Sequence, residues 1–279
     1  VKQKTKGLAK AGKVILIVLT VLFVIMMLVI PIFFIAAVIM TALGKDSIKS
    51  VTREEIKCGA MLGSALFGGF ALQIIALQYT TPSKNAFLTA TNVVIVPFIA
   101  LVIYKKKIPV KSLVGAGMAI VGAAVLSLQS DFSMGIGDLM TLACAVCFAL
   151  QIFLTGEFVG KIRPTVLNFL QMTTAFVLSG VGLIVTGSFR FKPSMESLLA
   201  VLYLGIVSTT ITYLLQTISQ KYVDETKSAI ILSMEAVFGT IFSVILLHET
   251  VTVRMITGSV LILAAVLVSE VSFSKKTNK

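Results

Sequence analysis

Polar side chains deep inside long apolar stretches are the residues of this chain whose chemistry could serve a function. The sharpest candidate is Glu235, about eight residues into an apolar stretch that begins near residue 227 and thus near the middle of a membrane-spanning helix. An ionisable group is costly at that depth unless it is paired, hydrated or functional. A carboxyl group there could be protonated in one state and ionised in another, coupling solute movement to protons. The open alternative is a hydrogen-bonded Glu that pins two helices together.

A second set of polar side chains can donate and accept hydrogen bonds within the apolar stretches. Gln73 and Gln216 lie late in their stretches, and Tyr213 precedes Gln216 by three residues, on the same helix face. Their polar groups could bind a substrate or join two neighbouring helices, and both readings stay open. Weaker candidates of the same kind are Asn85, Thr89, Gln151, Asn168 and Gln171.

One long stretch of the chain occurs twice. The segment Gln73–Leu126 aligns without a gap on the segment that starts at Gln216, an offset of 216 − 73 = 143 residues. Several residues recur at this offset: Gln73 with Gln216, Tyr79 with Tyr222, Lys84 with Lys227, Ala86 with Ala229, and Gly115 with Gly258. We interpret the match as an internal duplication of a membrane unit. We call residues 143 positions apart repeat mates, and the repeat mate of Glu235 is Asn92.

The composition is that of an integral membrane protein. Hydrophobic residues make up 57% of the chain, charged residues only 13%, and the mean hydropathy is +1.02. Apolar runs of roughly 20 residues favour helices over the shorter, alternating strands of a membrane barrel. The formal net charge of +12 resides in short loops and at the termini, which argues against a nucleic-acid partner. The predicted spans are 58–78, 84–104, 112–129, 136–155, 165–187, 196–218, 227–247 and 254–273.

The N-terminal part is the irregular part of this plan. We predict a basic tail at 1–13, a first membrane repeat at 14–129, a second at 136–273, and a basic tail at 274–279. Val14–Leu43 is one apolar run broken by Pro31 and too long for a signal peptide. It could cross the membrane once, form a hairpin at Pro31, or be the altered remainder of an ancestral helix, so the first repeat is atypical there.

The loop charges predict the orientation. Lys and Arg residues are concentrated in the linker 44–57, in the loops 105–111 and 157–164, and in the C-terminal tail, whereas the alternate loops are poorer in them. Positive loops face the cytoplasm, so the C-terminus should lie inside a multi-pass protein of the inner or cytoplasmic membrane. The offset spans five helices, an odd number, so the two copies must insert in opposite orientations. Inverted repeats place a substrate site near mid-membrane and open it to alternate sides.

Two motifs and their order resemble the drug/metabolite transporter superfamily, specifically its EamA-type members. They are ALQYTTPSKNAFL at 76–88 and SAIILSMEAVFGTIFSVILLHETVTVRMITGSVLILAAVL at 228–267, with Gly137-Asp138-Leu139 at the start of the second unit. Family members commonly carry an E-P pair and G-E-x-x-T in the second motif, where this chain has Ala236 and His248. The resemblance implies ten helices in two inverted five-helix repeats, and export of an amino acid, a similar metabolite or a drug.

The sequence therefore predicts an all-α integral membrane transporter with about nine clear spans and an incomplete first unit. Its expected substrate-binding residues are Gln73, Asn85, Thr89, Asn92, Gln151, Tyr213, Gln216 and Glu235, with Glu235 as the proton-coupling candidate. We expect no catalytic residues, cofactor or metal, because the cysteines lack a second pair and the chain has one histidine.

The partners expected from the sequence are a small-molecule substrate and membrane lipid, and a homodimer is left open. Two alternatives remain at this stage: a membrane-embedded enzyme, and a non-transporting remnant with a defective first repeat. The identity of the substrate, the direction of transport, the energy coupling and the arrangement of residues 1–43 do not follow from the sequence.

Overall fold

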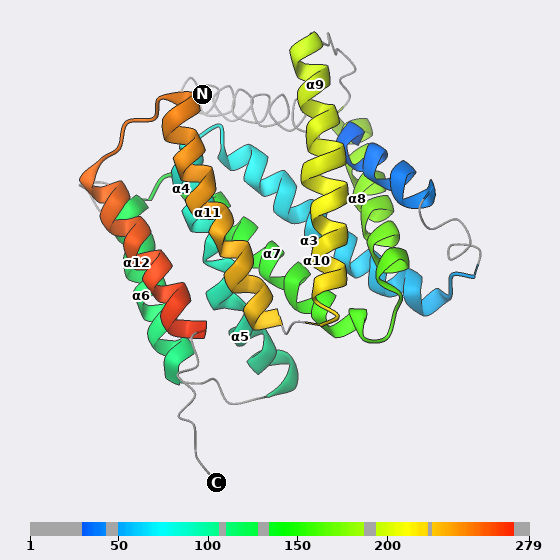
Figure 1. Ribbon diagram of the computed structural model, residues 1–279, viewed down its shortest axis with the longest axis horizontal. Coiled ribbons are helices and arrows are strands. Elements are labelled where there is room, and N and C mark those ends of the chain that lie inside the picture. Colours follow the sequence, from blue (N-terminus) through cyan, green and yellow to red (C-terminus); the bar gives the residue numbers. More distant parts are fainter. Residues whose placement is uncertain are drawn as a thin grey trace, which may run out of the picture. The chain divides into compact units, whose positions relative to one another are not determined.

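The computed structural model describes residues 30–42, 50–105, 110–127, 134–186, 194–222 and 225–270, and every element in these ranges is a helix (Figure 1). Five helical stretches of the described residues are long and apolar enough to cross a membrane: Arg53–Ala76, Pro82–Ile103, Ile136–Val159, Pro164–Gly182 and Leu198–Ser219. The prediction of an all-α membrane protein is confirmed. The N-terminal tail and residues 14–29 of the first apolar run lie outside the described residues. The helices are Ile30–Ala42, α3 (Arg53–Ala76), α4 (Pro82–Ala90), α5 (Asn92–Tyr104), α6 (Val110–Ser127), α7 (Ile136–Val159), α8 (Pro164–Thr186), α9 (Met195–Tyr203), η1 (Leu204–Ile211), α10 (Thr212–Ser219), α11 (Glu225–Leu247) and α12 (Val253–Glu270).

The predicted span 84–104 is not one continuous helix. It divides at Thr91 into α4 and α5, because the Thr91 amide and hydroxyl both donate to the Leu88 carbonyl, at 3.2 and 2.6 Å, and tighten the turn. Pro97 inside α5 removes one further backbone donor. Broken helices in membrane proteins are tolerated where they line a cavity or are buried in protein.

The predicted span 196–218 also contains an irregular segment. Between α9 and α10 the chain forms a π-helix, η1 (Leu204–Ile211). The hydroxyls of Thr210 and Thr212 donate to the carbonyls of Gly205 and Val207, five residues earlier in each case, at 2.6 and 3.1 Å. Such wide turns occur frequently at functional sites, and hydropathy alone does not predict them.

The helices form two compact units, and each unit draws on both halves of the sequence. Unit 1 contains the helix Ile30–Ala42, nearly all of α3, and α8, α9, η1 and α10. The Phe70 ring on α3 contacts Phe33 edge-on at 5.4 Å between centroids and Tyr213 of α10 at 6.1 Å. Unit 2 contains α4, α5, α6, α7, α11 and α12.

Close helix contact within unit 1 depends on Gly59 and Gly63 of α3. A Cβ atom at Gly59 would collide with the Leu170 Cβ atom, and one at Gly63 would lie 2.6 Å from the Gln171 carbonyl oxygen. The Gly-x-x-x-Gly spacing therefore lets α3 approach α8 closely. An added Cβ atom at Gly117 or Gly180 would have no neighbour within 4 Å, so close helix contact does not explain these two glycines.

The repeat mates in unit 2 run antiparallel. A Cβ atom at Gly122 of α6 would meet the Gly258 carbonyl oxygen at 3.0 Å and Ile262 Cγ1 at 2.8 Å, while Ala119, earlier in α6, clusters with Ala265, later in α12. Rising residue numbers in α6 thus face falling numbers in α12, as Figure 1 also shows. Opposite insertion of two copies of one unit requires this antiparallel pairing.

The same relation holds between α4–α5 and α11. An added Cβ atom at Gly239 would lie 3.6 Å from the Ala86 Cβ atom, and Leu232 packs against the cluster of Val96. α4 thus contacts the later residues of α11, and α5 contacts the earlier residues of α11. Both mate pairs of unit 2 are inverted.

The backbone carries a further trace of the duplication. Among the described residues other than glycine, Lys105 and His248 have a positive φ, 53° in each case, and they are repeat mates. Lys105 is the left-handed C-cap of α5, where its amide donates to the Leu101 carbonyl at 2.7 Å. A positive φ favours glycine, and the family that the sequence resembles commonly has glycine at the position of His248.

Candidate functional site

α4–α5 packs against α11 along stretches that contain the repeat mates Asn92 and Glu235. A Cβ atom at Gly239 would lie 3.6 Å from the Ala86 Cβ atom, and Leu232 packs against the cluster of Val96. Asn92 lies between Ala86 and Val96 in the first copy, and Glu235 lies between Leu232 and Gly239 in the second.

Asn92 and Glu235 each carry a polar group in an environment that is unusual for it. The Asn92 Oδ1 atom is buried and has no hydrogen-bond partner, which is costly for an amide oxygen away from water. Glu235 is exposed even though it lies in the middle of a 23-residue apolar helix. Among the helices long enough to span a membrane, and within the described residues, charged side chains otherwise lie near helix ends. The buried amide oxygen of Asn92 and the exposed carboxyl group of Glu235 are therefore the candidates for binding a solute or a proton.

Thr89 lies one turn before Asn92. Its hydroxyl oxygen is buried and has no hydrogen-bond partner, as is also true of the Asn92 Oδ1 atom. Two buried polar atoms without partners thus lie one turn apart on α4 and α5.

Two further predicted residues of unit 2 are occupied by structural hydrogen bonds. Asn85 is 3% exposed and donates through Nδ2 to the Thr141 hydroxyl of α7 at 3.0 Å. Gln151 is 1% exposed and donates through Nε2 to the Thr155 hydroxyl at 3.2 Å, one turn further along α7. Both side chains lie between helices, which is the reading the sequence left open beside substrate binding.

The remaining predicted residues lie in unit 1. Gln73 on α3 and Gln216 on α10 are half-buried, and Tyr213 on α10 is half-buried with its ring against Phe70. On α8, Gln171 donates through Nε2 to Asn168 Oδ1 at 2.5 Å, and both side chains are fully buried. The Asn168 Nδ2 atom has no partner.

The sequence reasoning missed a carboxylate network at the first turn of α4. The Glu249 Oε2 atom, on the connection between α11 and α12, accepts from the Ser83 amide at 3.3 Å, the Ser83 hydroxyl at 2.7 Å and the Ser243 hydroxyl at 2.5 Å. Burial by itself raises the pKa of Glu249, but these donors and Thr81 together lower it below its ordinary value. Because the pKa of Glu249 is lower in the folded than in the unfolded protein, its ionised form contributes to the stability of the fold. This contribution is complete above the ordinary pKa of a glutamate and is lost as the pH falls through the folded-state pKa.

A second carboxylate holds the same turn from α7. Asp138 Oδ1 accepts from the Thr80 hydroxyl at 2.6 Å, and Asp138 Oδ2 lies 3.5 Å from Lys84 Nζ. Gly137 permits this approach, because a Cβ atom there would lie 2.7 Å from the Tyr79 carbonyl carbon. The signal that could have exposed the network is the Gly-Asp pair at the start of α7.

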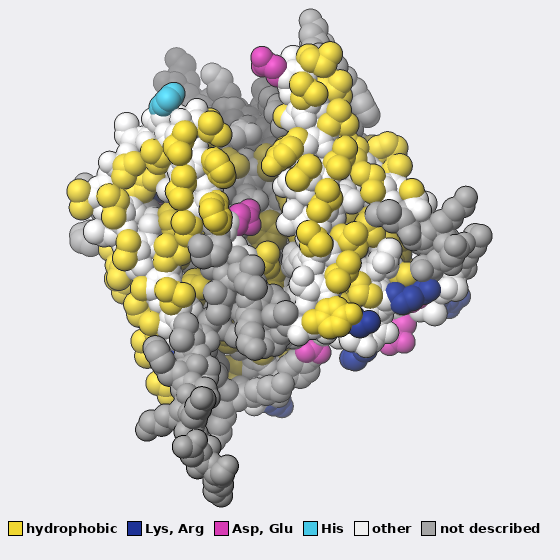
Figure 2. Space-filling model, viewed as in Figure 1, with side chains coloured by type: hydrophobic (Ala, Val, Ile, Leu, Met, Phe, Trp, Pro, Cys, Tyr) yellow, Lys and Arg dark blue, Asp and Glu magenta, His cyan; other side chains and the backbone are white. Residues whose placement is uncertain are grey.

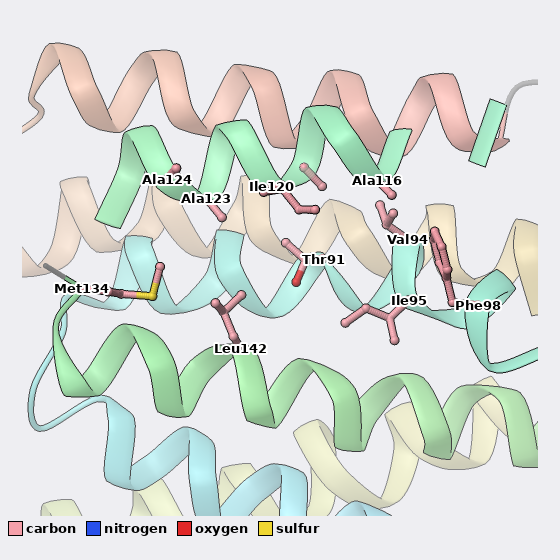
Figure 3. Close-up of a pocket in the computed structure, with 11 residues that line it drawn as sticks. Thr91, Val94, Ile95, Phe98, Ala116, Ile120, Ala123, Ala124, Met134 and Leu142 are labelled. Atoms are coloured by element: carbon pink, nitrogen blue, oxygen red, sulfur yellow. The ribbon is translucent and has the colours of Figure 1, made fainter. Parts of the chain in front are cut away.

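A cavity of about 400 Å³ lies between α5, α6 and α7 (Figure 3). Thr91 contributes the one polar side chain among its eleven lining residues, and the Thr91 hydroxyl already donates to the Leu88 carbonyl. An apolar lining with no free polar group does not orient a polar metabolite. The polar candidates lie at the helix crossing instead.

Metal and redox chemistry find no support in the described part of the chain. No group of three or more His, Cys, Asp or Glu side chains there could hold a metal ion. The three cysteines Cys58, Cys144 and Cys147 are free. Hydrophobic side chains cover much of the surface visible in Figure 2, as expected of helices in contact with lipid.

Comparison with known proteins is consistent with this picture. A relative from Archaeoglobus fulgidus named "Uncharacterized transporter" is 34% identical over 214 residues, which cover 77% of this chain and 68% of the relative. A Salmonella typhimurium protein named "Probable amino-acid metabolite efflux pump" is 26% identical over 241 residues, with 80% of each chain covered. A solved structure described only as "Crystal structure of protein" matches with a TM-score of 0.64 at 19% identity, covering 88% of this chain and 87% of that one, and supports the fold alone.

The family comparison covers nearly the whole chain. The model of the EamA-like transporter family matches twice, at residues 10–128 and at 135–270. Family and relatives alike are named for transport rather than for enzymatic activity. The chain is a multi-pass membrane transporter and belongs to the EamA-like transporter family.

Proposed function

We propose that this transporter exports a small organic metabolite of the amino-acid type by alternating access, with its substrate site at the crossing of α4–α5 and α11. Two observations carry the proposal: the Asn92 Oδ1 atom is buried without a partner, and its repeat mate Glu235 lies in the middle of the 23-residue helix α11, which packs against α4 and α5. A site on the axis between inverted copies can face either side of the membrane through equivalent rearrangements.

Glu235 is the proposed proton-coupling group. A carboxyl group at mid-membrane needs a compensating charge when it ionises, and the described spanning helices offer no Lys or Arg at that depth. A proton and a substrate bearing a positive group would therefore compete for it. The amide oxygen of Asn92 and the hydroxyl of Thr89 would accept hydrogen bonds from the same substrate.

The proposed location and topology follow from the loop charges. The protein would lie in the cytoplasmic membrane with its C-terminus inside, and the basic loops 105–111 and 157–164 would face the cytoplasm. Export is the proposed direction, in line with a relative named as an amino-acid metabolite efflux pump.

Transport by reconstituted protein tests this proposal. Proteoliposomes loaded with a mixture of radiolabelled amino acids, with a pH gradient imposed, should release label faster than empty liposomes. Glu235→Gln should lower the pH-dependent rate by about tenfold, the factor for roughly 1.4 kcal/mol of lost coupling. Glu157→Gln, at the end of α7, is the matched control and should behave as the native protein. An unchanged pH dependence in Glu235→Gln would remove the coupling role.

A further inference from the structure

The first turn of α4 is held by two carboxylates that come from different elements of unit 2. Glu249 binds Ser83 through both its amide and its hydroxyl, and Asp138 binds Thr80 and Lys84. Both carboxylates belong to the second half of the sequence, whereas the turn they hold belongs to the first half. This network therefore joins the two halves at one end of unit 2.

The element so held is short and has a natural pivot at its other end. α4 has only nine residues and ends at the Thr91 break, after which α5 starts with Asn92. A short helix with a break at one end can rotate about that break when contacts at the other end are released. Its buried polar residues, Asn85 and Thr89, would move with it.

The opposite end of unit 2 lacks this arrangement in its sequence. The repeat mate of Glu249 is Lys106, and that of Ser83 is Thr226. α11, the mate of α4–α5, has no break and runs as one helix of 23 residues. The pairing of Glu249 with Ser83 is therefore not repeated at the other end of unit 2.

We propose that Asp138 and Glu249 are positioning residues that latch the first turn of α4, and that the transport cycle opens this end of unit 2 by releasing the latch. By the loop charges this is the outer end. Lys84, Asp138, His248 and Arg254 are the other charged or titratable groups on the elements that surround Glu249. The inference rests on the proposed function only in treating α4 as part of the substrate pathway.

A thiol-labelling experiment tests the latch without a substrate. Cys58, Cys144 and Cys147 are replaced by Ala, and Phe87→Cys is introduced as a reporter in α4, one turn from the Thr91 pivot, where the native side chain is 4% exposed. Whole cells are treated with a membrane-impermeant maleimide. Glu249→Gln or Asp138→Asn should raise the labelling rate of the reporter about tenfold, because hydrogen bonds to charged groups are lost. An unchanged rate in both variants would overturn the proposal.

Two controls separate a latch from general loosening. A reporter at Ala145→Cys, fully buried on α7, should keep its labelling rate in the same variants, and a parallel rise there would contradict the proposal. Exchanging the charges in the double variant Lys84→Asp and Asp138→Lys should restore slow labelling relative to Asp138→Asn. Failure of this rescue would show that the ion pair does not hold α4.

Transport measurements on the same variants show whether the latch takes part in the transport cycle. With the radiolabelled amino-acid mixture, Glu249→Gln should raise KM about fivefold with a smaller change in kcat, since the closed form would be less populated. Faster labelling with unchanged kinetics would overturn the role in transport. If the native protein moves none of the mixture, the proposed substrate class fails, and the labelling results still decide the latch.

Discussion

α4–α5 and α11 descend from one ancestral helix, and their differences indicate how the two copies divide the work. The first copy is broken at Thr91, contains Pro97 and is latched at its start. The second is continuous over 23 residues and carries the mid-membrane carboxyl group of Glu235. A pivoting copy and a rigid copy that meet at one crossing can change the surroundings of that carboxyl group without moving it. We propose on this basis that the first copy moves during transport and that the second supplies the charge.

The most drastic way to break this division is to lock the two copies together. The double variant Ala86→Cys and Gly239→Cys should form a disulfide, because the corresponding Cβ atoms would lie 3.6 Å apart, within the bonding range. If α4 must pivot, transport of the amino-acid mixture should cease under oxidising conditions and return on reduction. Full transport by the oxidised, locked protein would show that α4 stays fixed relative to α11.

Exchanging the polar residues of the two copies tests whether they serve one site. Asn92→Glu and Glu235→Asn should each lower the transport rate about tenfold, by changing the charge at the crossing. The double variant keeps one carboxyl group and one amide near the same axis and should recover most of the native rate. If the transport rate of the double variant fell by the product of the two decreases seen in the single variants, the two residues would lie in separate environments.

The helix-breaking proline of the first copy can be exchanged with the residue at the matching position of the second copy. The repeat mate of Pro97 is Thr240. Pro97→Thr restores a backbone donor to α5 and should raise the free energy of unfolding by about 1–3 kcal/mol, whereas Thr240→Pro should lower it by about 3 kcal/mol. Thermal unfolding in detergent measures both. Equal stability losses in the two variants would contradict the claim that only the first copy is built around a break.

The smallest expected effect concerns a feature that the copies share. Lys105→Gly and His248→Gly should each stabilise the protein by about 0.5 kcal/mol, because glycine adopts a positive φ without strain. Lys105→Ala and His248→Ala are the matched controls and should not stabilise. A gain at only one of the two positions would show that the helix ends are not equivalent.

The sequence predicted the helices well, because a long run of high hydropathy marks a segment that can cross the lipid bilayer as a helix. The span predicted at 136–155 is α7 at Ile136–Val159, and that at 227–247 is α11 at Glu225–Leu247. It did not predict the break at Thr91 or the π-helix at Leu204–Ile211. Both depend on individual hydrogen bonds, such as that from the Thr91 hydroxyl to the Leu88 carbonyl, which leave hydropathy unchanged.

The candidate site was predicted only in part. Matching by the 143-residue offset singled out Asn92 and Glu235 as a pair, and the antiparallel crossing gives that pairing a structural basis. Asn85 and Gln151 looked similar in sequence but pair with Thr141 and Thr155. Whether a buried amide is free or paired depends on its neighbour in space. For the same reason the partners of Glu249 could not be read from the sequence.

The most direct test of the account is the accessibility of residue 92 from each side of the membrane. Asn92→Cys in the background without native cysteines is treated with an impermeant thiol reagent, first from outside intact cells and then from the exposed cytoplasmic face of inverted vesicles. A hydrated site that opens alternately predicts labelling from both faces, with Ile262→Cys, fully buried in unit 2, unlabelled as control. Labelling from neither face, with reaction only toward a lipid-soluble reagent, would contradict the account.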